Sequence, residues 1–230
     1  MKNILFWPYQ MYAWLVLLHL VAIITLLLST LTVIFAWRVN PHFGSRVFAT
    51  TWASTIGFLW PIWVTVDCAD HAQRDRRYVV ASNQQSLFEI LVLYGWLMID
   101  MKWVIKAELR KLPGVGIGCE KAGHIYVDRS NPELARKAVR DALDFVGDGV
   151  GVLFFPEGTR SLDGRMGAFK KGAFRVATSQ KLPILPVTLI GTRDIQKAKS
   201  LLIVPGKMRM VIHPAIEVSG DDDPETIRAL

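Results

Sequence analysis

The sequence predicts an α/β protein: a mixed or mostly parallel sheet flanked by helices, preceded by an N-terminal helical motif in a membrane. From about residue 78 onward, short apolar runs typical of strands alternate with segments typical of helices. Such alternation is characteristic of a sheet with parallel strands. Before that, Asp, Glu, Lys and Arg are all absent between Lys2 and Arg38. We therefore expect two units, a membrane-embedded helical motif at 1–66 and an α/β domain at 67–230.

The composition supports a membrane protein with anionic partners. Hydrophobic residues make up 51% of the 230 residues, and the formal net charge is +7. A basic chain favours phospholipid headgroups or phosphorylated substrates. The sequence has no dense Lys/Arg tract with interleaved aromatics, so we expect no nucleic-acid partner. The two cysteines, Cys68 and Cys119, support neither a disulfide framework nor a zinc site and favour a reducing compartment.

The first apolar stretch has the features of a membrane helix. Trp14–Trp37 is long enough to cross a bilayer core at about 1.5 Å per residue. Tyr9 and Tyr12 at one end and Trp37 at the other resemble interfacial belts. Arg38 and Arg46 follow, and this charge bias predicts that the residues after Arg38 lie in the cytoplasm. We expect an inner-membrane protein with its site facing the cytoplasm.

A second uncharged stretch, Val47–Val66, contains Gly57 and Pro61 and predicts a kinked or interfacial helix. Two arrangements remain open for the N-terminal motif. The first helix crosses the bilayer fully, or the two helices form a hairpin that dips into one leaflet.

The rest of the chain reads as a series of strands, helices and turns. A polar loop is expected at Asp67–Arg77, a turn around Pro113, Gly114 and Gly116, and an acidic tail near the end. The expected strands are Tyr78–Ser82, Lys102–Ala107, His124–Val127, Val150–Phe155, Pro183–Ile190 and Met208–His213. The expected helices are Leu87–Met98, Asn131–Val146 and Gly167–Gln180.

A polar cluster, Asn83–Glu89, separates the first of these strands from an apolar helix. Reactive groups of α/β proteins are often placed at such junctions. Positions 84 and 89 have the spacing of a general base and its orienting carboxylate, but the amide of Gln84 has no titratable nitrogen near neutral pH. Ser86 and Glu89 also match a capping box, in which the glutamate reaches back to the start of the helix.

A second candidate site follows the strand at Val150–Phe155, in the run Pro156-Glu-Gly-Thr-Arg-Ser161. A sharp turn there would present Glu157 and Arg160 side by side at the edge of the sheet. Arginine suits a phosphate because its fork of donors binds two oxygens at once. The alternative is a turn with a surface ion pair. Lys170 and Lys171 are likewise either a solvated helix start or contacts to a headgroup or coenzyme A.

Several blocks occur in a fixed order, and together they resemble the lysophosphatidic acid (1-acyl-sn-glycerol-3-phosphate) acyltransferase family. The resemblance covers about residues 60 to 215, and the N-terminal helical pair looks like that of bacterial members. The blocks are Asn83-Gln-Gln-Ser-x-x-Glu89, Lys106-x-Glu-Leu109 with Pro113-Gly-x-Gly116, Tyr126-Val-Asp-Arg129, Phe155-Pro-Glu-Gly-Thr-Arg160, Phe169-Lys-Lys-Gly172 and Leu185-Pro-Val187.

The resemblance implies acyl transfer from acyl-CoA or acyl-carrier protein to the 2-hydroxyl of lysophosphatidic acid, with no metal or cofactor. In the family, a His in an Asn-His-x-Ser-x-x-Asp block takes the hydroxyl proton and the Asp orients it. These two positions are Gln84 and Glu89 here. The residues implied to hold the acceptor phosphate are Lys106, Arg129, Glu157, Gly158, Thr159 and Arg160.

The chain departs from the family pattern at the base. Losing a general base typically costs about 10²- to 10⁴-fold in rate, so we expect this form to be impaired or inactive, whether Gln84 is natural or introduced. No other histidine repeats the spacing to a carboxylate, and His124 is the least implausible substitute. The alternative function is a non-catalytic lysophospholipid-binding relative that keeps the phosphate site.

Overall fold

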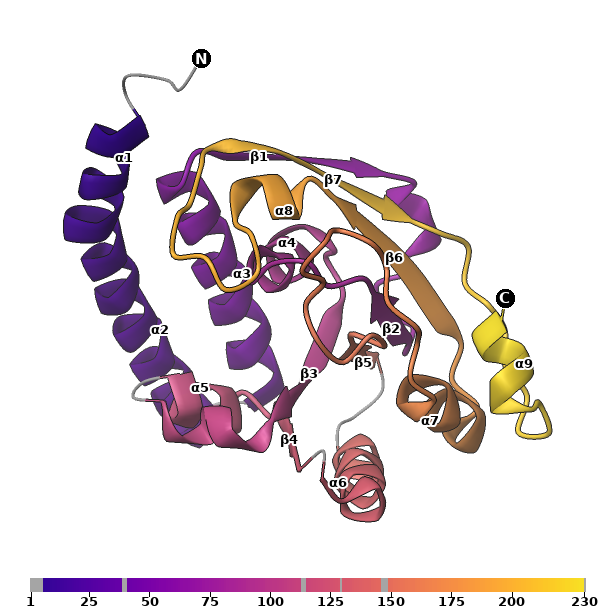
Figure 1. The fold of residues 1–230 in the computed structure, drawn as a ribbon. Coiled ribbons are helices and arrows are strands. Elements are labelled where there is room, and N and C mark those ends of the chain that lie inside the picture. The colour runs from indigo at the N-terminus through magenta and orange to yellow at the C-terminus, as the bar shows by residue number, and fades with distance from the viewer. Residues whose placement is uncertain (1–5, 39–40, 113–114, 129, 146–148, 230) are drawn as a thin grey trace.

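The computed structural model describes residues 6–38, 41–112, 115–128, 130–145 and 149–229. Within these ranges it confirms the predicted fold class, a mostly parallel sheet flanked by helices (Figure 1). The strands are β1 Ile62–Asp67, β2 Val79–Ser82, β3 Asp100–Lys106, β4 Ile125–Val127, β5 Val150–Phe154, β6 Ile184–Ile190 and β7 Gly206–Ile212. The α-helices are α1 Phe6–Tyr12, α2 Leu18–Arg38, α3 Pro41–Leu59, α4 Phe88–Trp96, α5 Val115–Lys121, α6 Pro132–Phe145, α7 Gly172–Gln180, α8 Thr192–Ile195 and α9 Pro224–Ala229.

The strands of the described chain form one sheet in the order β1-β7-β6-β2-β5-β3-β4. Each neighbouring pair is parallel except β6 and β7, which are antiparallel. In the register of the central strands, Ala81 of β2 lies between Phe154 of β5 and Pro186 of β6. The carboxyl ends of β2, β5 and β6 therefore meet at one edge of the sheet, where ligands bind in open α/β folds.

Two apolar cores cover the two faces of this sheet. One core contains Val80, Leu153 and Leu185 and includes residues of α3 and α4. The other contains Val79 and Val152 and includes residues of α6, α7 and α9. Side chains of one strand alternate between faces, so β2 and β5 contribute to both cores and hold the two layers of helices together.

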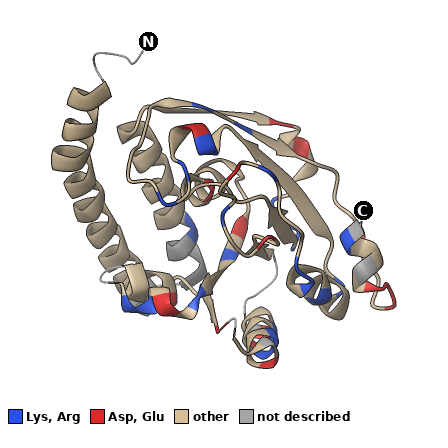
Figure 2. Cartoon of the chain, in the orientation of Figure 1, with Lys and Arg blue, Asp and Glu red and all other residues tan. Residues whose placement is uncertain are grey.

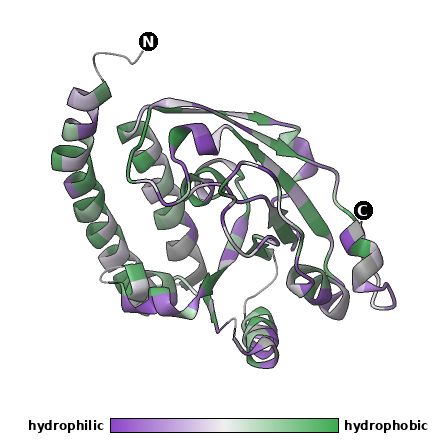
Figure 3. Ribbon diagram, viewed as in Figure 1, coloured by the Kyte–Doolittle hydropathy of each residue, from purple (hydrophilic) through white to green (hydrophobic). Residues whose placement is uncertain are grey.

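The N-terminal helices cover the first of these faces. α1 continues through a π-helical turn at Ala13–Leu17 into α2, which packs against α3. Among the described residues, Phe6–Phe35 is the helical segment whose 30 residues are long and apolar enough to cross a membrane. Large apolar side chains on it, such as Leu15 and Ile23, are more than half exposed. Figure 3 shows hydrophobic residues along α1 and α2.

A buried glutamine ties this helix to the sheet domain. Gln10 is fully buried, and its Nε2 donates to the carbonyl oxygen of Ile203 at 2.7 Å. The backbone N–H of Ile203 donates in turn to Gln10 Oε1 at 3.2 Å. The indole N–H of Trp14 adds a bond to the carbonyl oxygen of Leu201. The helix and the loop before β7 are therefore held at a defined rotation.

Three of the expected elements differ from the structure. Val47–Val66 was predicted to be one kinked helix, but α3 ends at Leu59 and Ile62–Asp67 forms strand β1. Pro61 lacks a backbone N–H and stands at this change. The helix expected from Gly167 begins at Gly172. The division of the chain at residue 66 stays a prediction, and residues 62–66 belong to the sheet.

Helix α5 forms where a turn was expected, and a glycine explains how it packs. A Cβ atom on Gly118 would lie 2.5 Å from Ser29 Oγ of α2, closer than real side chains approach. The absence of a side chain thus lets α5 lie directly against α2. The helix is stabilised by this tertiary contact rather than by its glycine-rich local sequence.

Asn83 extends the ladder between β2 and β6 by one side chain. It is buried, its Oδ1 accepts from the N–H of Leu189 at 2.7 Å, and its Nδ2 donates to the carbonyl oxygen of Leu189 at 2.9 Å. The amide therefore imitates a strand backbone where the main chain of β2 turns away. This contact fixes the start of the Asn83–Glu89 segment on the sheet.

His124, just before β4, is enclosed beneath α4. Its Nδ1 accepts from the backbone N–H of Trp103 at 3.3 Å and lies 3.4 Å from the hydroxyl of Tyr94. The residue is half-buried and lines a pocket between α2, α3, α4 and α5. Burial, aided by the charge of Lys102, lowers the pKa of His124 to about 3. The native ring is therefore neutral at ordinary pH.

We predict that Asn83→Ala lowers the free energy of unfolding by about 1–3 kcal/mol, because both polar groups of Leu189 lose a buried partner. Urea titration of the detergent-solubilised protein measures this. The matched control is Gln73→Ala, which removes an exposed amide and should cost less than about 0.5 kcal/mol. Equal costs for the two variants would contradict the role given to Asn83.

The pKa of His124 predicts acid sensitivity. A histidine in the unfolded chain takes up a proton near pH 6.5, whereas the native ring does so only near pH 3. The unfolded state therefore binds more protons between these values, and the free energy of unfolding falls as pH drops from about 7 toward 4. His124→Gln, which does not titrate, should show a shallower fall. If plots of the free energy of unfolding against pH were parallel for the two proteins, the low pKa assigned to native His124 would be wrong.

Candidate functional site

The candidate site lies where the carboxyl ends of β2, β5 and β6 meet (Figure 1). The Asn83–Glu89 segment leaves β2, the Pro156–Ser161 turn leaves β5, and Thr192 begins α8 directly after β6. The structure therefore brings together two segments that the sequence separates by about 70 residues. It also adds a third, from β6, that sequence reasoning did not assign.

Gln84 is held through its backbone. Its N–H donates to Glu157 Oε1 at 2.8 Å, and its carbonyl oxygen accepts from the N–H of Ser161 at 2.9 Å. The residue is half-buried. Within the described part of the chain its side-chain amide has no hydrogen-bond partner, so it is available to a ligand at this edge.

Glu157 joins the two segments of the site. It is 6% exposed; besides Gln84 it accepts from the backbone N–H of Gly167 at 2.8 Å, through Oε2. Each carboxylate oxygen thus faces a main-chain donor. Gln85 adds a further link, because its Nε2 donates to the carbonyl oxygen of Gly164. The loop from Ser161 to Gly167 is thus bonded to the Asn83–Glu89 segment at Ser161 and Gly164, and to Glu157 at Gly167.

Glu89 lies fully buried at the start of α4. Its Oε1 accepts from the N–H groups of Gln85 at 2.9 Å and Ser86 at 2.8 Å, and Ser86 Oγ accepts from the N–H of Phe88. The glutamate half of the predicted capping box is therefore formed, whereas the serine hydroxyl accepts from Phe88 rather than from the N–H of Glu89. The hydroxyl of Thr192 donates to the same Oε1 at 2.5 Å. Burial raises the pKa of Glu89, and these donors oppose the rise.

The hydrogen bonds of Glu89 bear on its expected role as the partner of position 84. The hydrogen bonds that the structure gives Glu89 go to Gln85, Ser86 and Thr192. Its role as the orienting carboxylate for position 84 stays a prediction. Thr192 is a residue of the site that the sequence analysis missed. Its only local signal was its place immediately after a strand, next to Gly191.

Arg160 stands in the turn after β5, on a backbone that a glycine makes possible. Gly158 has a φ of +74°, and a Cβ atom there would lie 2.7 Å from Lys170 Nζ. Thr159 is exposed and Arg160 half-buried. Arg160 has no ion-pair partner among the described side chains. The alternative reading of this turn, a surface ion pair with Glu157, is not formed, because both Glu157 oxygens face main-chain donors.

Two further cations were expected at the phosphate site. Lys106 ends β3 and is exposed, with its Nζ 2.8 Å from Glu108 Oε1. This contact lowers the pKa of Glu108. Lys106 therefore takes part in an exposed ion pair with Glu108. Such a pair contributes little to stability in water. Arg129 lies outside the described residues.

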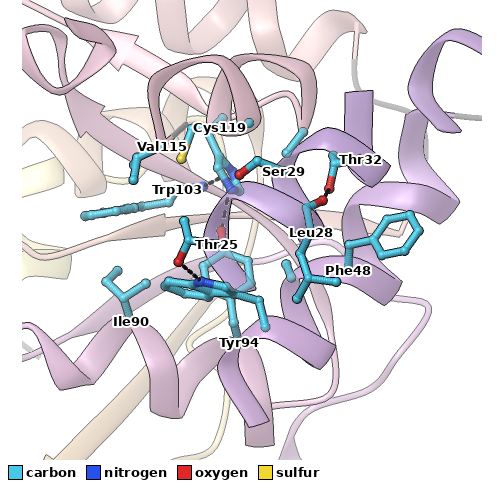
Figure 4. A pocket seen from close by; sticks show the side chains of 15 residues that line it. Thr25, Leu28, Ser29, Thr32, Phe48, Ile90, Tyr94, Trp103, Val115 and Cys119 are labelled. Atoms are coloured by element: carbon cyan, nitrogen blue, oxygen red, sulfur yellow. Dashed lines mark hydrogen bonds between the residues drawn. The ribbon is translucent and has the colours of Figure 1, made fainter. Parts of the chain in front are cut away.

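An apolar pocket of about 120 Å³ lies between α2, α3, α4 and α5 (Figure 4). The indole N–H of Trp52 donates to Thr25 Oγ1 within its wall. His124 and Cys119 line it, and burial raises the pKa of the Cys119 thiol to about 11. Neither a histidine with a pKa of about 3 nor this thiol suits the role of base or nucleophile near neutral pH. The described residues contain no cluster of three potential metal ligands.

Comparisons with known proteins agree with this architecture. A protein-family model described as Acyltransferase matches residues 64–190. A crystal structure of the 1-acyl-sn-glycerophosphate (LPA) acyltransferase from Thermotoga maritima superposes with a TM-score of 0.81 at 24% identity, covering 100% of this chain and 92% of that one. At this identity the superposition supports the fold alone.

Curated relatives carry more specific names. A 1-acyl-sn-glycerol-3-phosphate acyltransferase of Chlamydomonas reinhardtii is 32% identical over 217 residues, which cover 92% of this chain and 64% of that protein. The human 1-acyl-sn-glycerol-3-phosphate acyltransferase alpha is 32% identical over 173 residues, covering 74% and 61%. The chain thus spans less than two thirds of the length of these relatives. The family model matches more than half of the chain, which therefore belongs to the acyltransferase family, together with the 1-acyl-sn-glycerol-3-phosphate acyltransferases it resembles.

Proposed function

We propose that the chain is a membrane-bound O-acyltransferase. It moves a fatty acyl group from acyl-CoA or acyl-carrier protein to the 2-hydroxyl of lysophosphatidic acid, giving phosphatidic acid, and it needs no cofactor. The observation that carries the proposal is the Glu157 carboxylate, which joins the base position to the turn bearing Arg160. If Arg160 held the phosphate of lysophosphatidic acid, the 2-hydroxyl of the same molecule would lie near position 84.

The proposed chemistry requires a proton acceptor at position 84. The acceptor hydroxyl attacks the thioester carbonyl, and a base takes the hydroxyl proton. The carbon–sulfur bond then breaks, and the base returns the proton to the leaving thiolate. The Gln84 amide can accept a hydrogen bond from the hydroxyl but cannot take its proton near neutral pH. We therefore propose that substrate is positioned normally while transfer is slow or absent.

Arg160 is the main contact to the acceptor phosphate in this proposal. Its guanidinium has five donors and no competing carboxylate among the described side chains, which suits bidentate phosphate binding. Gly158, Thr159, Lys106 and Arg129 complete the proposed set. Glu157 serves it indirectly by fixing the turn, because both of its oxygens already face backbone N–H groups.

The proposal places the protein at the inner membrane with its site facing the cytoplasm. The exposed apolar surface of the segment Phe6–Phe35 supports membrane contact. The positive residues that follow this segment in the sequence support the orientation. A water-insoluble acceptor and a soluble donor would then meet at the boundary between the bilayer and the cytoplasm.

A non-catalytic lysophospholipid-binding protein is the second candidate. It is favoured by Gln84 itself, because the sequence keeps the residues proposed to bind phosphate while an amide stands where the proton acceptor is expected. Both functions require Arg160. Only the enzyme hypothesis predicts that a base introduced at position 84 restores acyl transfer.

We predict that Gln84→His raises the rate of acyl transfer to lysophosphatidic acid by at least about 10²-fold, because it supplies the missing base. The assay follows labelled phosphatidic acid formed by the purified protein. The matched control, Gln85→His, makes the same change one residue away and should give less than a tenth of that gain. Equal activity of the original chain and Gln84→His would contradict the role of position 84. Lipid binding without transfer in either protein would favour the second candidate.

We also predict that Arg160→Ala weakens binding of lysophosphatidic acid by roughly tenfold or more, because a charge-assisted contact to phosphate is lost. Binding is measured on the Gln84 protein, where no turnover interferes. Arg165→Ala is the matched control, since Arg165 lies exposed in the same loop. Unchanged affinity in Arg160→Ala, or equal losses in both variants, would remove Arg160 from the phosphate site.

A further inference from the structure

A basic groove lies between α6 and α7, outside the site described above. It encloses about 530 Å³ and its charged lining consists of four cations and one carboxylate: Arg136, Lys137, Arg140, Arg175 and Glu133. All five are exposed. Lys137 pairs with Asp141 at 2.7 Å, whereas the three arginines have no ion-pair partner among the described residues. Figure 2 shows basic residues on both helices.

The groove continues toward the candidate site through a second hollow of about 350 Å³. The two hollows share Arg136, Arg175 and Val176 in their linings. The lining of the second hollow is mainly apolar and also includes Lys170 and Lys171. Pro156 and Gly158 belong to it as well. These residues flank Glu157, which bonds to the backbone of Gln84.

We propose that this groove binds the phosphorylated nucleotide of coenzyme A, and that the adjoining hollow receives its pantetheine arm on the way to position 84. The inference rests on the proposed function, because it assigns the donor of that reaction. Its physical basis is a match of shape and charge. Coenzyme A has a highly anionic head and a long, weakly polar arm, and the basic groove adjoins a hollow with a mainly apolar lining.

The location of the groove favours a water-soluble ligand. Its walls are α6 and α7. Their buried residues belong to one apolar core, whereas those of α3 and α4 belong to the core on the opposite face of the sheet. The exposed apolar segment Phe6–Phe35 continues into α2, which packs against α3. Figure 1 shows α6 and α7 away from α1 and α2. A lipid headgroup in a bilayer contacting α1 and α2 would not reach it.

Size and shape favour a nucleotide over a protein surface. Volumes of about 300–1,000 Å³ are usual for small-molecule sites, and both hollows fall in this range. Arginines suit this ligand because their planar forks bind phosphate oxygens in pairs and stack on aromatic bases. Acyl-carrier protein would instead need a broad contact surface, and is an alternative outcome of the test.

The test measures coenzyme A binding to the detergent-solubilised full chain by calorimetry, at two salt concentrations. The double variant Arg140→Glu/Arg175→Glu should bind coenzyme A at least about tenfold more weakly, because two charge-assisted contacts become repulsive. The matched control, Lys197→Glu/Lys207→Glu, reverses two exposed charges outside the groove and should change affinity less than about twofold. Thermal melting checks that both variants are folded. Binding should also weaken with added salt.

Three results would overturn the inference. Coenzyme A affinity could be the same in the groove and control variants, or be lost equally in both. The chain could bind holo-acyl-carrier protein, or vesicles containing phosphatidylglycerol, through these arginines while failing to bind coenzyme A. Since binding is measured without turnover, it is separate from the Gln84→His assay. A failure of that assay leaves the groove result intact, and a failure here leaves a carrier-protein-dependent transferase possible.

Discussion

The parallel pairing of β2 with both β5 and β6 is the constraint on which the site depends. Because three adjacent strands run in the same direction, the segments that leave them meet at one edge, although they are far apart in the sequence. The two cores on either side of these strands keep the edge in place. Among the named strands of the described sheet, the antiparallel pair is β6 with β7.

Two buried carboxylates then organise the edge by accepting main-chain N–H groups. Glu157 holds the turn after β5 against the segment after β2, and Glu89 holds the start of α4 and the first residue of α8. A buried carboxylate is costly unless donors surround it. Apart from the hydroxyl of Thr192, these donors are backbone groups, so the edge is built from rigid elements whatever side chain occupies position 84. The architecture of this edge therefore does not depend on the residue at position 84.

The sequence predicted most of the central strands and helices, because their apolar runs are bounded by clear polar turns. It also predicted the glutamate half of the capping box at Ser86 and Glu89, which depends on local spacing. Strand β1 was missed because its partner β7 lies about 140 residues away, and α5 because its glycines matter only where they meet α2. The roles of Gln10 and Thr192 required tertiary contacts that no local pattern encodes. Glu157 was expected beside a phosphate, but its orientation depends on Gly167, ten residues later.

The amide clasp between Gln10 and Ile203 has a consequence for how the molecule would sit in a bilayer. An anchor joined by a flexible linker would let an enzyme rise, sink and rotate above the lipid surface. A buried two-way hydrogen bond removes that freedom, since one residue inserted between Gln10 and α2 would rotate Gln10 by about 100° away from its partner. The N-terminal helix and the edge of the sheet are thus held in one fixed arrangement. If this helix lies in a bilayer, the height of the edge above the lipid is set by helical register.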